Sequence, residues 1–202
     1  MGPQHNENHH RWYVLSVLYS HFEYQTGGGV GGLATYHAFR KHLPDSVVEL
    51  YEAYSSPVSS AMIIGGGLGL APNGQRVIAE LSPEAMFYIS DRAYTAASFV
   101  FRDQNGKLLG EKRWKADKLG YGQIMTPRAV VHEGLLLGIS QEDPNVIWGK
   151  RVTSVKELAT SVEVEFDDGQ VKRCDLLIGA DGVHSLCRQA IFGKDKYIPE
   201  YE

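Results

Sequence analysis

The stretch FEYQTGGGVGGLATYHAF, residues 22–39, places a cluster of glycines directly before a segment of helical character. Gly27, Gly29 and Gly32 fit the pattern G-x-G-x-x-G. In that pattern the first glycine permits a tight turn, the second lets the backbone approach a pyrophosphate, and the third lets helix and strand pack closely. The stretch therefore predicts a glycine turn that leads into a helix, with the free N–H groups of the helix aimed at an anion.

The segment after the glycines completes a nucleotide-binding unit. The expected helix ends in the basic residues 40–42 and is followed by Pro44, as is typical of a helix end. The next segment, SVVELYEA (46–53), reads as a buried strand, which gives a βαβ unit with parallel pairing. Glu52 lies twenty residues after Gly32, where an acid accepts hydrogen bonds from the adenosine ribose hydroxyls. An acid there disfavours a 2′-phosphate, so a dinucleotide other than NADP is expected.

The segment before the glycines is unusual for a central strand. Residues 22–26, FEYQT, carry Glu23 and Gln25, whereas a central parallel strand is normally almost continuously apolar. The apolar run at 14–18 is interpreted as lying too far upstream to feed the turn. We therefore expect a disordered or atypical N-terminal segment over residues 1–21 and one incomplete nucleotide-binding domain over residues 22–202.

Composition limits the classes of partner. The 202 residues have a net charge of −4 with acids and bases interspersed, so no nucleic-acid partner is expected. The apolar stretch at 12–20 is too short to span a bilayer and lacks the features of a signal peptide. Cys174 and Cys187 have no metal spacing and are expected to be reduced thiols in a cytoplasmic protein. The N-terminal histidines have no partnering Cys or acid cluster, so no metal site is predicted.

Two dipeptides predict β-hairpins. Asn105-Gly106 lies between candidate strands in SFVFRDQNGKLLGEKRW, and Asp168-Gly169 lies between those of SVEVEFDDGQVKRCDLLI. Both dipeptides suit two-residue primed turns. In the second hairpin Val162, Val164 and Phe166 alternate with acids, which indicates a half-exposed strand. The expected fold is thus α/β, a βαβ nucleotide unit with inserted antiparallel ribbons.

Three later segments identify a family resemblance. CDLLIGADGVHSLCR (174–188) reads as a buried strand over 175–178, then Asp181-Gly182 and a short helix. It resembles the Asp-Gly motif of the class A FAD-dependent monooxygenases, the family of p-hydroxybenzoate and salicylate hydroxylases. GLGLAPNGQRVI, from a glycine-rich run (63–81) with a helix expected near Pro72, and TPRAVVHEGL around Arg128 are also similar to family segments. The resemblance covers about residues 27–200, with fungal salicylate-hydroxylase-like proteins as the nearest type.

The resemblance implies a Rossmann-like FAD-binding domain of the p-hydroxybenzoate hydroxylase type. By this resemblance Gly27, Gly29 and Gly32 would hold the FAD pyrophosphate, and Glu52 the adenosine ribose. The remaining positions would lie along the rest of the cofactor: Arg128 beside its ribityl and phosphate length, Gly66 where the chain passes the flavin, and Asp181 with Gly182 near the flavin and the reductant.

The resemblance also implies the reaction. NAD(P)H would reduce FAD, and one oxygen atom of O2 would pass to an organic, possibly aromatic, small-molecule substrate. No catalytic residue is assigned. The chain stops at Glu202, so most of the substrate-binding sheet is expected to be missing and only its start to lie near the C-terminal end. An inactive FAD- or nucleotide-binding fragment, and a reductase or halogenase of the same fold, stay open as alternatives.

Overall fold

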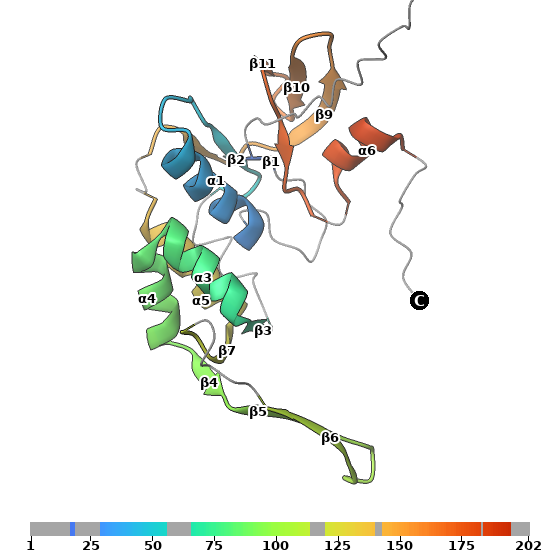
Figure 1. Cartoon of the computed structure of the whole chain (residues 1–202). Coiled ribbons are helices and arrows are strands. Elements are labelled where there is room, and N and C mark those ends of the chain that lie inside the picture. The colour runs from blue at the N-terminus through green and yellow to red at the C-terminus, as the bar shows by residue number, and fades with distance from the viewer. Residues whose placement is uncertain are drawn as a thin grey trace, which may run out of the picture.

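A computed structural model describes residues 17–18, 29–55, 66–113, 120–139, 143–182 and 184–194. Figure 1 shows a parallel sheet with α1 against it, a helical layer of α3, α4 and α5, and two antiparallel ribbons that extend from the body. The helices are α1 (Val30–His42), α3 (Pro72–Leu81), α4 (Pro83–Asp91), α5 (Arg128–Leu137) and α6 (Leu186–Phe192).

The parallel sheet has the order β12-β1-β2-β8. Its strands are β1 (Val17–Leu18), β2 (Leu50–Glu52), β8 (Val146–Trp148) and β12 (Ile178–Gly179), and every neighbouring pair is parallel. The strand before α1 therefore comes from the upstream apolar run, and the prediction that this run lies too far away to serve was wrong. The expected strand at 22–26 lies outside the described residues.

The βαβ unit is otherwise as predicted, with shorter strands. Helix α1 begins at Val30, inside the glycine cluster, and ends in the basic residues 40–42. All three residues of β2 are buried, and Glu52 is its last residue. The prediction placed this strand at 46–53, but Val47 is 88% exposed and precedes it. The strand predicted at 175–178 is also short, since β12 comprises only Ile178 and Gly179.

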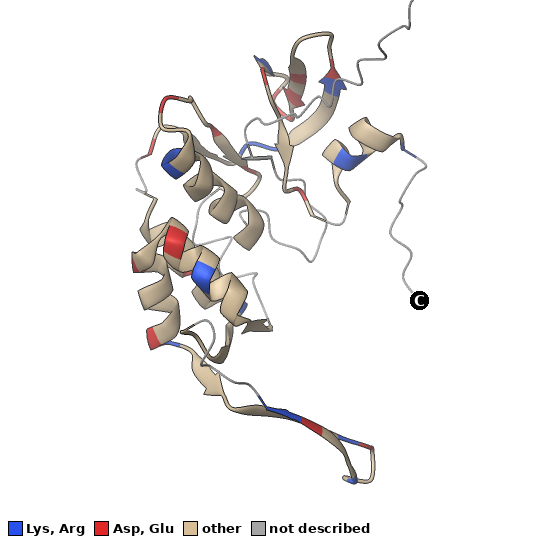
Figure 2. Ribbon diagram, viewed as in Figure 1, with Lys and Arg blue, Asp and Glu red and all other residues tan. Residues whose placement is uncertain are grey.

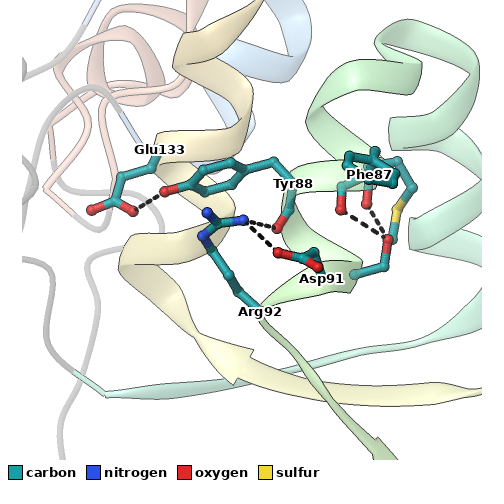
Figure 3. A network of polar contacts seen from close by, with 7 residues as sticks. Phe87, Tyr88, Asp91, Arg92 and Glu133 are labelled. Atoms are coloured by element: carbon teal, nitrogen blue, oxygen red, sulfur yellow. Dashed lines mark hydrogen bonds and ion pairs between the residues drawn. The ribbon is translucent and has the colours of Figure 1, made fainter.

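The helical layer covers a second, antiparallel sheet of order β3-β7-β4. Its strands are β3 (Gly67–Leu70), β7 (Gln123–Pro127) and β4 (Tyr94–Ala96), and α3 begins at Pro72 as predicted. Figure 3 shows how α4 is fastened to α5: the Tyr88 hydroxyl donates to Glu133 at 3.0 Å, and the Arg92 guanidinium lies 3.8 Å from the Tyr88 ring centroid. Helix α5, whose first residue is Arg128, is thereby held in place by its neighbours.

Both predicted hairpins form, but their turns differ from the prediction. They are β5 (Ser98–Arg102) with β6 (Leu108–Arg113), and β10 (Val162–Phe166) with β11 (Val171–Cys174), the latter extended by β9 (Val152–Glu157). The N–H of Gly106 donates to the Asp103 carbonyl, and that of Gly169 to the Phe166 carbonyl. Each glycine therefore ends a four-residue turn, in the left-handed region with φ of 81° and 79°, instead of standing at its centre. An aspartate three residues earlier in the first turn accepts two backbone N–H groups, which explains the longer loop.

Two apolar clusters form the core. The larger joins α1, the parallel sheet and the helical layer around Leu33, Leu50 and Leu135. The smaller cluster joins β2 to the ribbon of β9, β10 and β11, where the rings of Tyr51 and Phe166 pack with centroids 4.7 Å apart. Val162, Val164 and Phe166 are buried, as the alternation in β10 predicted. Because β2 contributes to both clusters, the residue at its end, Glu52, is set in a rigid position.

Candidate functional site

The carboxyl edge of the parallel sheet gathers most of the predicted site. Glu52 ends β2, Asp181 and Gly182 follow β12, and α1 begins beyond the end of β1. In open parallel sheets, ligands bind at this edge, in the crevice formed by the loops that leave the strands. The topology thus brings Glu52, the start of α1 and the Asp-Gly turn to the same edge.

The N-terminus of α1 is suited to an anion. Its N-cap residue is Gly29, no side chain caps it, and its first turn carries no acid. A Cβ added at Gly31 would meet no atom within 4 Å, so the space beside the first turn is open. Gly32 is buried in the first turn of α1, and its role in close packing of helix and strand stays a prediction. Gly27, the first glycine of the pattern, lies outside the described residues.

Glu52 is a fully buried carboxyl group with one oxygen still available. Its exposed fraction is 0%. Oε1 accepts the backbone N–H of Tyr54 at 2.8 Å, whereas Oε2 is buried without a hydrogen-bond partner among the described residues. Burial raises the pKa of Glu52 to about 7, although backbone N–H groups and the charge of Arg151 oppose the rise. An orphaned buried acceptor is costly, and a pair of ribose hydroxyls would satisfy it.

Asp181 is held by α6 in a fixed position. It is 4% exposed, and its Oδ2 accepts the backbone N–H of Cys187 at 3.1 Å. Gly179 makes this approach possible, because a Cβ there would lie 2.3 Å from the Cβ of Cys187. Gly182 follows with φ of 71° and open space around its Cα. The turn after β12 therefore exposes backbone where a ligand can lie close.

Arg128 and Gly66 form a second group. The backbone N–H of Arg128 donates to the carbonyl of Gly66 at 3.1 Å, and the adjacent Gly67 pairs with Pro127. Gly66 has φ of 89°, and a Cβ there would meet no atom within 4 Å. The structure thus brings together two residues that lie 62 positions apart in the printed sequence. Gly66 directly precedes β3 and Arg128 directly follows β7, so this pair lies at the antiparallel sheet, whereas Glu52 ends a strand of the parallel one.

Sequence reasoning missed Lys150 and Arg151, which follow β8. The N–H of Lys150 donates to the Glu52 carbonyl at 2.8 Å, and the N–H of Gly149 to the Tyr54 carbonyl at 2.6 Å. The positive charge of Arg151 acts on both Glu52 and Tyr54. The signal available in the sequence was a short apolar run, VIW, followed by Gly-Lys-Arg, which marks a cation at the end of a strand.

A groove of about 470 Å³ lies away from this edge, beside the amino end of β2. Its wall includes Tyr36, Arg40 and Asp143. The Tyr36 hydroxyl donates to Asp143 at 2.9 Å, and Arg40 pairs with the same carboxylate at 3.3 Å. Tyr36 and Arg40 both bond to Asp143, so these side chains link the end of α1 to the loop before β8.

The described residues contain neither a membrane-spanning helix nor a cluster of metal ligands. No helix within the described ranges is long and apolar enough to cross a bilayer. Within the same ranges, no three His, Cys, Asp or Glu side chains lie together as metal ligands would. The N-terminal histidines lie outside the described residues.

Comparison with known proteins shows similarity to FAD-dependent monooxygenases. The chain is 31% identical over 187 residues to salicylate hydroxylase of Pseudomonas putida, an alignment of 87% of this chain and 39% of that protein. It is 31% identical over 173 residues to the FAD-dependent monooxygenase paxM of Penicillium paxilli, covering 82% of this chain and 34% of paxM. No family profile matches the chain. The chain thus spans well under half the length of these relatives.

Solved structures show the same fold. Klebsiella pneumoniae HpxO, complexed with FAD and uric acid, superposes with a TM-score of 0.64 at 26% identity, over 87% of this chain and 41% of that one. The structure of FqzB superposes with a TM-score of 0.68 at 24% identity, over 91% and 40%. The resemblance to class A FAD-dependent monooxygenases and the p-hydroxybenzoate hydroxylase type of fold are both confirmed. The site residues stay predictions.

Proposed function

We propose that this chain binds FAD and forms the FAD-binding part of an NAD(P)H-dependent flavin monooxygenase. The observation that carries the proposal is Glu52: a buried carboxyl group at the carboxyl edge of the parallel sheet, whose Oε2 has no hydrogen-bond partner among the described residues. The helix α1, with a glycine as its N-cap residue, begins at the same edge. An adenosine ribose and a pyrophosphate supply the complementary groups, hydroxyl donors and anionic oxygens.

Each site residue has a defined task toward FAD. Glu52 would accept hydrogen bonds from the ribose, and the backbone of Gly27, Gly29 and Gly32 would surround the pyrophosphate. Arg128 supports the ribityl and phosphate region from the start of α5, where among the described residues no acid forms an ion pair with it. Bound FAD supplies the redox chemistry, and the chain orients it.

The remaining residues would lie toward the flavin. Gly66 and Gly182 both combine a positive φ with open space at the missing Cβ, so a planar ring can lie against backbone at either position. Asp181, whose Oδ2 accepts the Cys187 N–H, would lie near the flavin and the reductant.

The proposed reaction consumes O2 and NAD(P)H and inserts one oxygen atom into an organic substrate. Names of the relatives support this reaction, since they include a salicylate hydroxylase and a 6-methylsalicylate 1-monooxygenase. Those proteins are more than twice as long as the region aligned with this chain. The reaction is therefore proposed for a protein of the relatives' full length, and not for residues 1–202 alone.

We further propose that residues 1–202 alone bind FAD without efficient hydroxylation. Oxygen transfer needs a site that excludes water. The β5–β6 hairpin leaves large apolar side chains uncovered, with Phe101 57% and Leu109 66% exposed, and it extends from the body in Figure 1. Such a surface is typical of a face that another layer covers.

Titration of the chain with FAD tests the proposed function, followed by flavin or tryptophan fluorescence. Saturable binding of FAD, with weaker binding of FMN, supports it; no binding of FAD in a folded preparation would overturn it. Adding NAD(P)H and a panel of phenols to the loaded chain then separates activity from binding. Peroxide release without hydroxylated product is expected, and coupled product formation would contradict the second proposal.

A further inference from the structure

Glu52 interacts with two segments of the chain, its own strand end and the segment after β8. On its own strand, Oε1 is engaged by the Tyr54 N–H at 2.8 Å. From the segment that links β8 to β9, Lys150 bonds to the Glu52 carbonyl, and Arg151 acts on the carboxyl group through its charge. Tyr54 is the other titratable group that interacts with Glu52 within the described residues.

The two carboxyl oxygens are not equivalent in this arrangement. Because Oε1 accepts an N–H, the proton of the neutral acid is placed on Oε2, the oxygen with no partner among the described residues. Oε2 is also the oxygen that a ribose hydroxyl would approach as a donor. A proton on Oε2 and a ribose hydroxyl therefore compete for the same lone pairs.

We propose that the adenosine ribose binds to the ionised form of Glu52, so that binding releases one proton, and that the positive charge of Arg151 lowers the pH at which this release occurs. The inference rests on the proposed function and adds to it a form of regulation. The O–H bond on Oε2 breaks, its proton passes to solvent, and the ribose hydroxyl donates to the freed oxygen.

The sign of the effect follows from burial. Below pH 7 the neutral acid is favoured in the free chain, because burial raises the pKa of Glu52 to about 7. Donation by ribose hydroxyls stabilises the carboxylate and lowers that pKa in the complex. Affinity is then constant above pH 8 and falls by about tenfold per pH unit as the pH drops below 7.

Arg151 is a positioning residue, because it acts on the ligand only through Glu52. Its charge favours ionised Glu52, so its loss should move the pH transition upward. Its backbone N–H is bonded to Asp167 Oδ1 at 3.3 Å, and Asp167 in turn donates its N–H to the Arg151 carbonyl at 2.8 Å. These backbone bonds do not depend on the side chain, so Arg151→Gln and Arg151→Lys should leave the segment in place.

Calorimetric titration with FAD, whose pyrophosphate does not titrate in this range, between pH 5.5 and 8.5 tests the inference. Repeating each titration in two buffers of different ionisation enthalpy counts the protons released. For the unmodified chain we expect an affinity about tenfold lower at pH 6 than at pH 8 and release of close to one proton at pH 6. Glu52→Gln should bind with an affinity that does not change with pH. Arg151→Gln should shift the transition to higher pH, and Arg151→Lys should restore it.

The outcomes separate this inference from the proposed function. Binding of FAD with the same affinity and no proton release across the range would overturn the inference and leave the proposed function intact. A transition that persists unchanged in Glu52→Gln would also overturn it. Absence of FAD binding at every pH, with the fold confirmed by circular dichroism, would overturn both.

Discussion

Replacing Glu52 by glutamine should change how the stability of the ligand-free chain depends on pH. Glu52 is fully buried at the end of β2, and burial raises its pKa from 4.5 to about 7 in the folded chain. The folded state therefore holds a proton that the unfolded state releases between these two values. For an acid whose folded pKa is raised, stability is lost as the pH rises through this window and is constant above it.

The magnitude follows from the size of that rise. One pKa unit corresponds to about 1.4 kcal/mol, so ionising Glu52 inside the fold costs about 3 kcal/mol in total. Between pH 5 and 8.5 the free energy of unfolding of the unmodified chain should fall by about 2 to 3 kcal/mol relative to Glu52→Gln. All other titrating groups are shared by the two proteins, and their contributions cancel in this difference.

Urea unfolding followed by circular dichroism at several pH values measures the difference. A control is Glu49→Gln, three residues earlier. Burial acts to raise the pKa of Glu49, but hydrogen bonds from Tyr51 and Lys172 outweigh it and lower the pKa. Its curve should run parallel to that of the unmodified chain above pH 5. A parallel curve for Glu52→Gln as well would refute the view that Glu52 is a buried acid with a raised pKa.

Three further outcomes are expected. Gly179→Ala should destabilise the chain by about 1 to 3 kcal/mol in urea unfolding, because a Cβ there would lie 2.3 Å from the Cβ of Cys187; unchanged stability would mean that α6 does not pack on β12. Tyr88→Phe should cost about 0.5 to 1.5 kcal/mol, since it removes the 3.0 Å bond to Glu133, and an unchanged unfolding midpoint would contradict that link. FAD should bind more tightly than FMN or NADP, and Glu52→Ala should weaken FAD binding by about 1 to 3 kcal/mol, measured by fluorescence titration; equal affinity for FMN would contradict the ribose contact.

Patterns in the sequence correctly predicted those helices and strands that depend on interactions between residues close together in the chain. The helix after the glycines, the start of α3 at Pro72 and the alternation in β10 follow from periodicity and helix-end residues, and each is present. Glu52 could be placed because its distance from the glycines is set by one helix and one strand. The turn types were missed, since they depend on side-chain bonds such as those of Asp103, which a dipeptide pattern does not include.

Long-range arrangement could not be read in the same way. Arg151 acts on Glu52 only because β8 pairs with β2, and no spacing in the sequence predicts that pairing. The meeting of Gly66 with Arg128 likewise depends on pairing between β3 and β7. Resemblance to a family suggested both cofactor roles, whereas the residues alone gave no reason to place them together.

The central strand of the parallel sheet shows that the cost of burying polar side chains can outweigh closeness in the sequence. Two segments compete for the position beside β2: residues 22–26, next to the glycines, and the apolar run that includes Val17 and Leu18. A strand in the middle of a parallel sheet is buried on both faces, and burying Glu23 or Gln25 there without partners costs several kcal/mol. Val17 pairs with both Ile178 and Leu50, so the apolar segment takes the position despite its greater distance. The glycines are therefore positioned relative to α1, with Gly29 at the N-cap and Gly32 in the first turn. Their distance from the preceding strand is not the one that the pattern usually has. Anion binding by the helix N-terminus depends on that helical register, so the predicted pyrophosphate site is compatible with the longer connection.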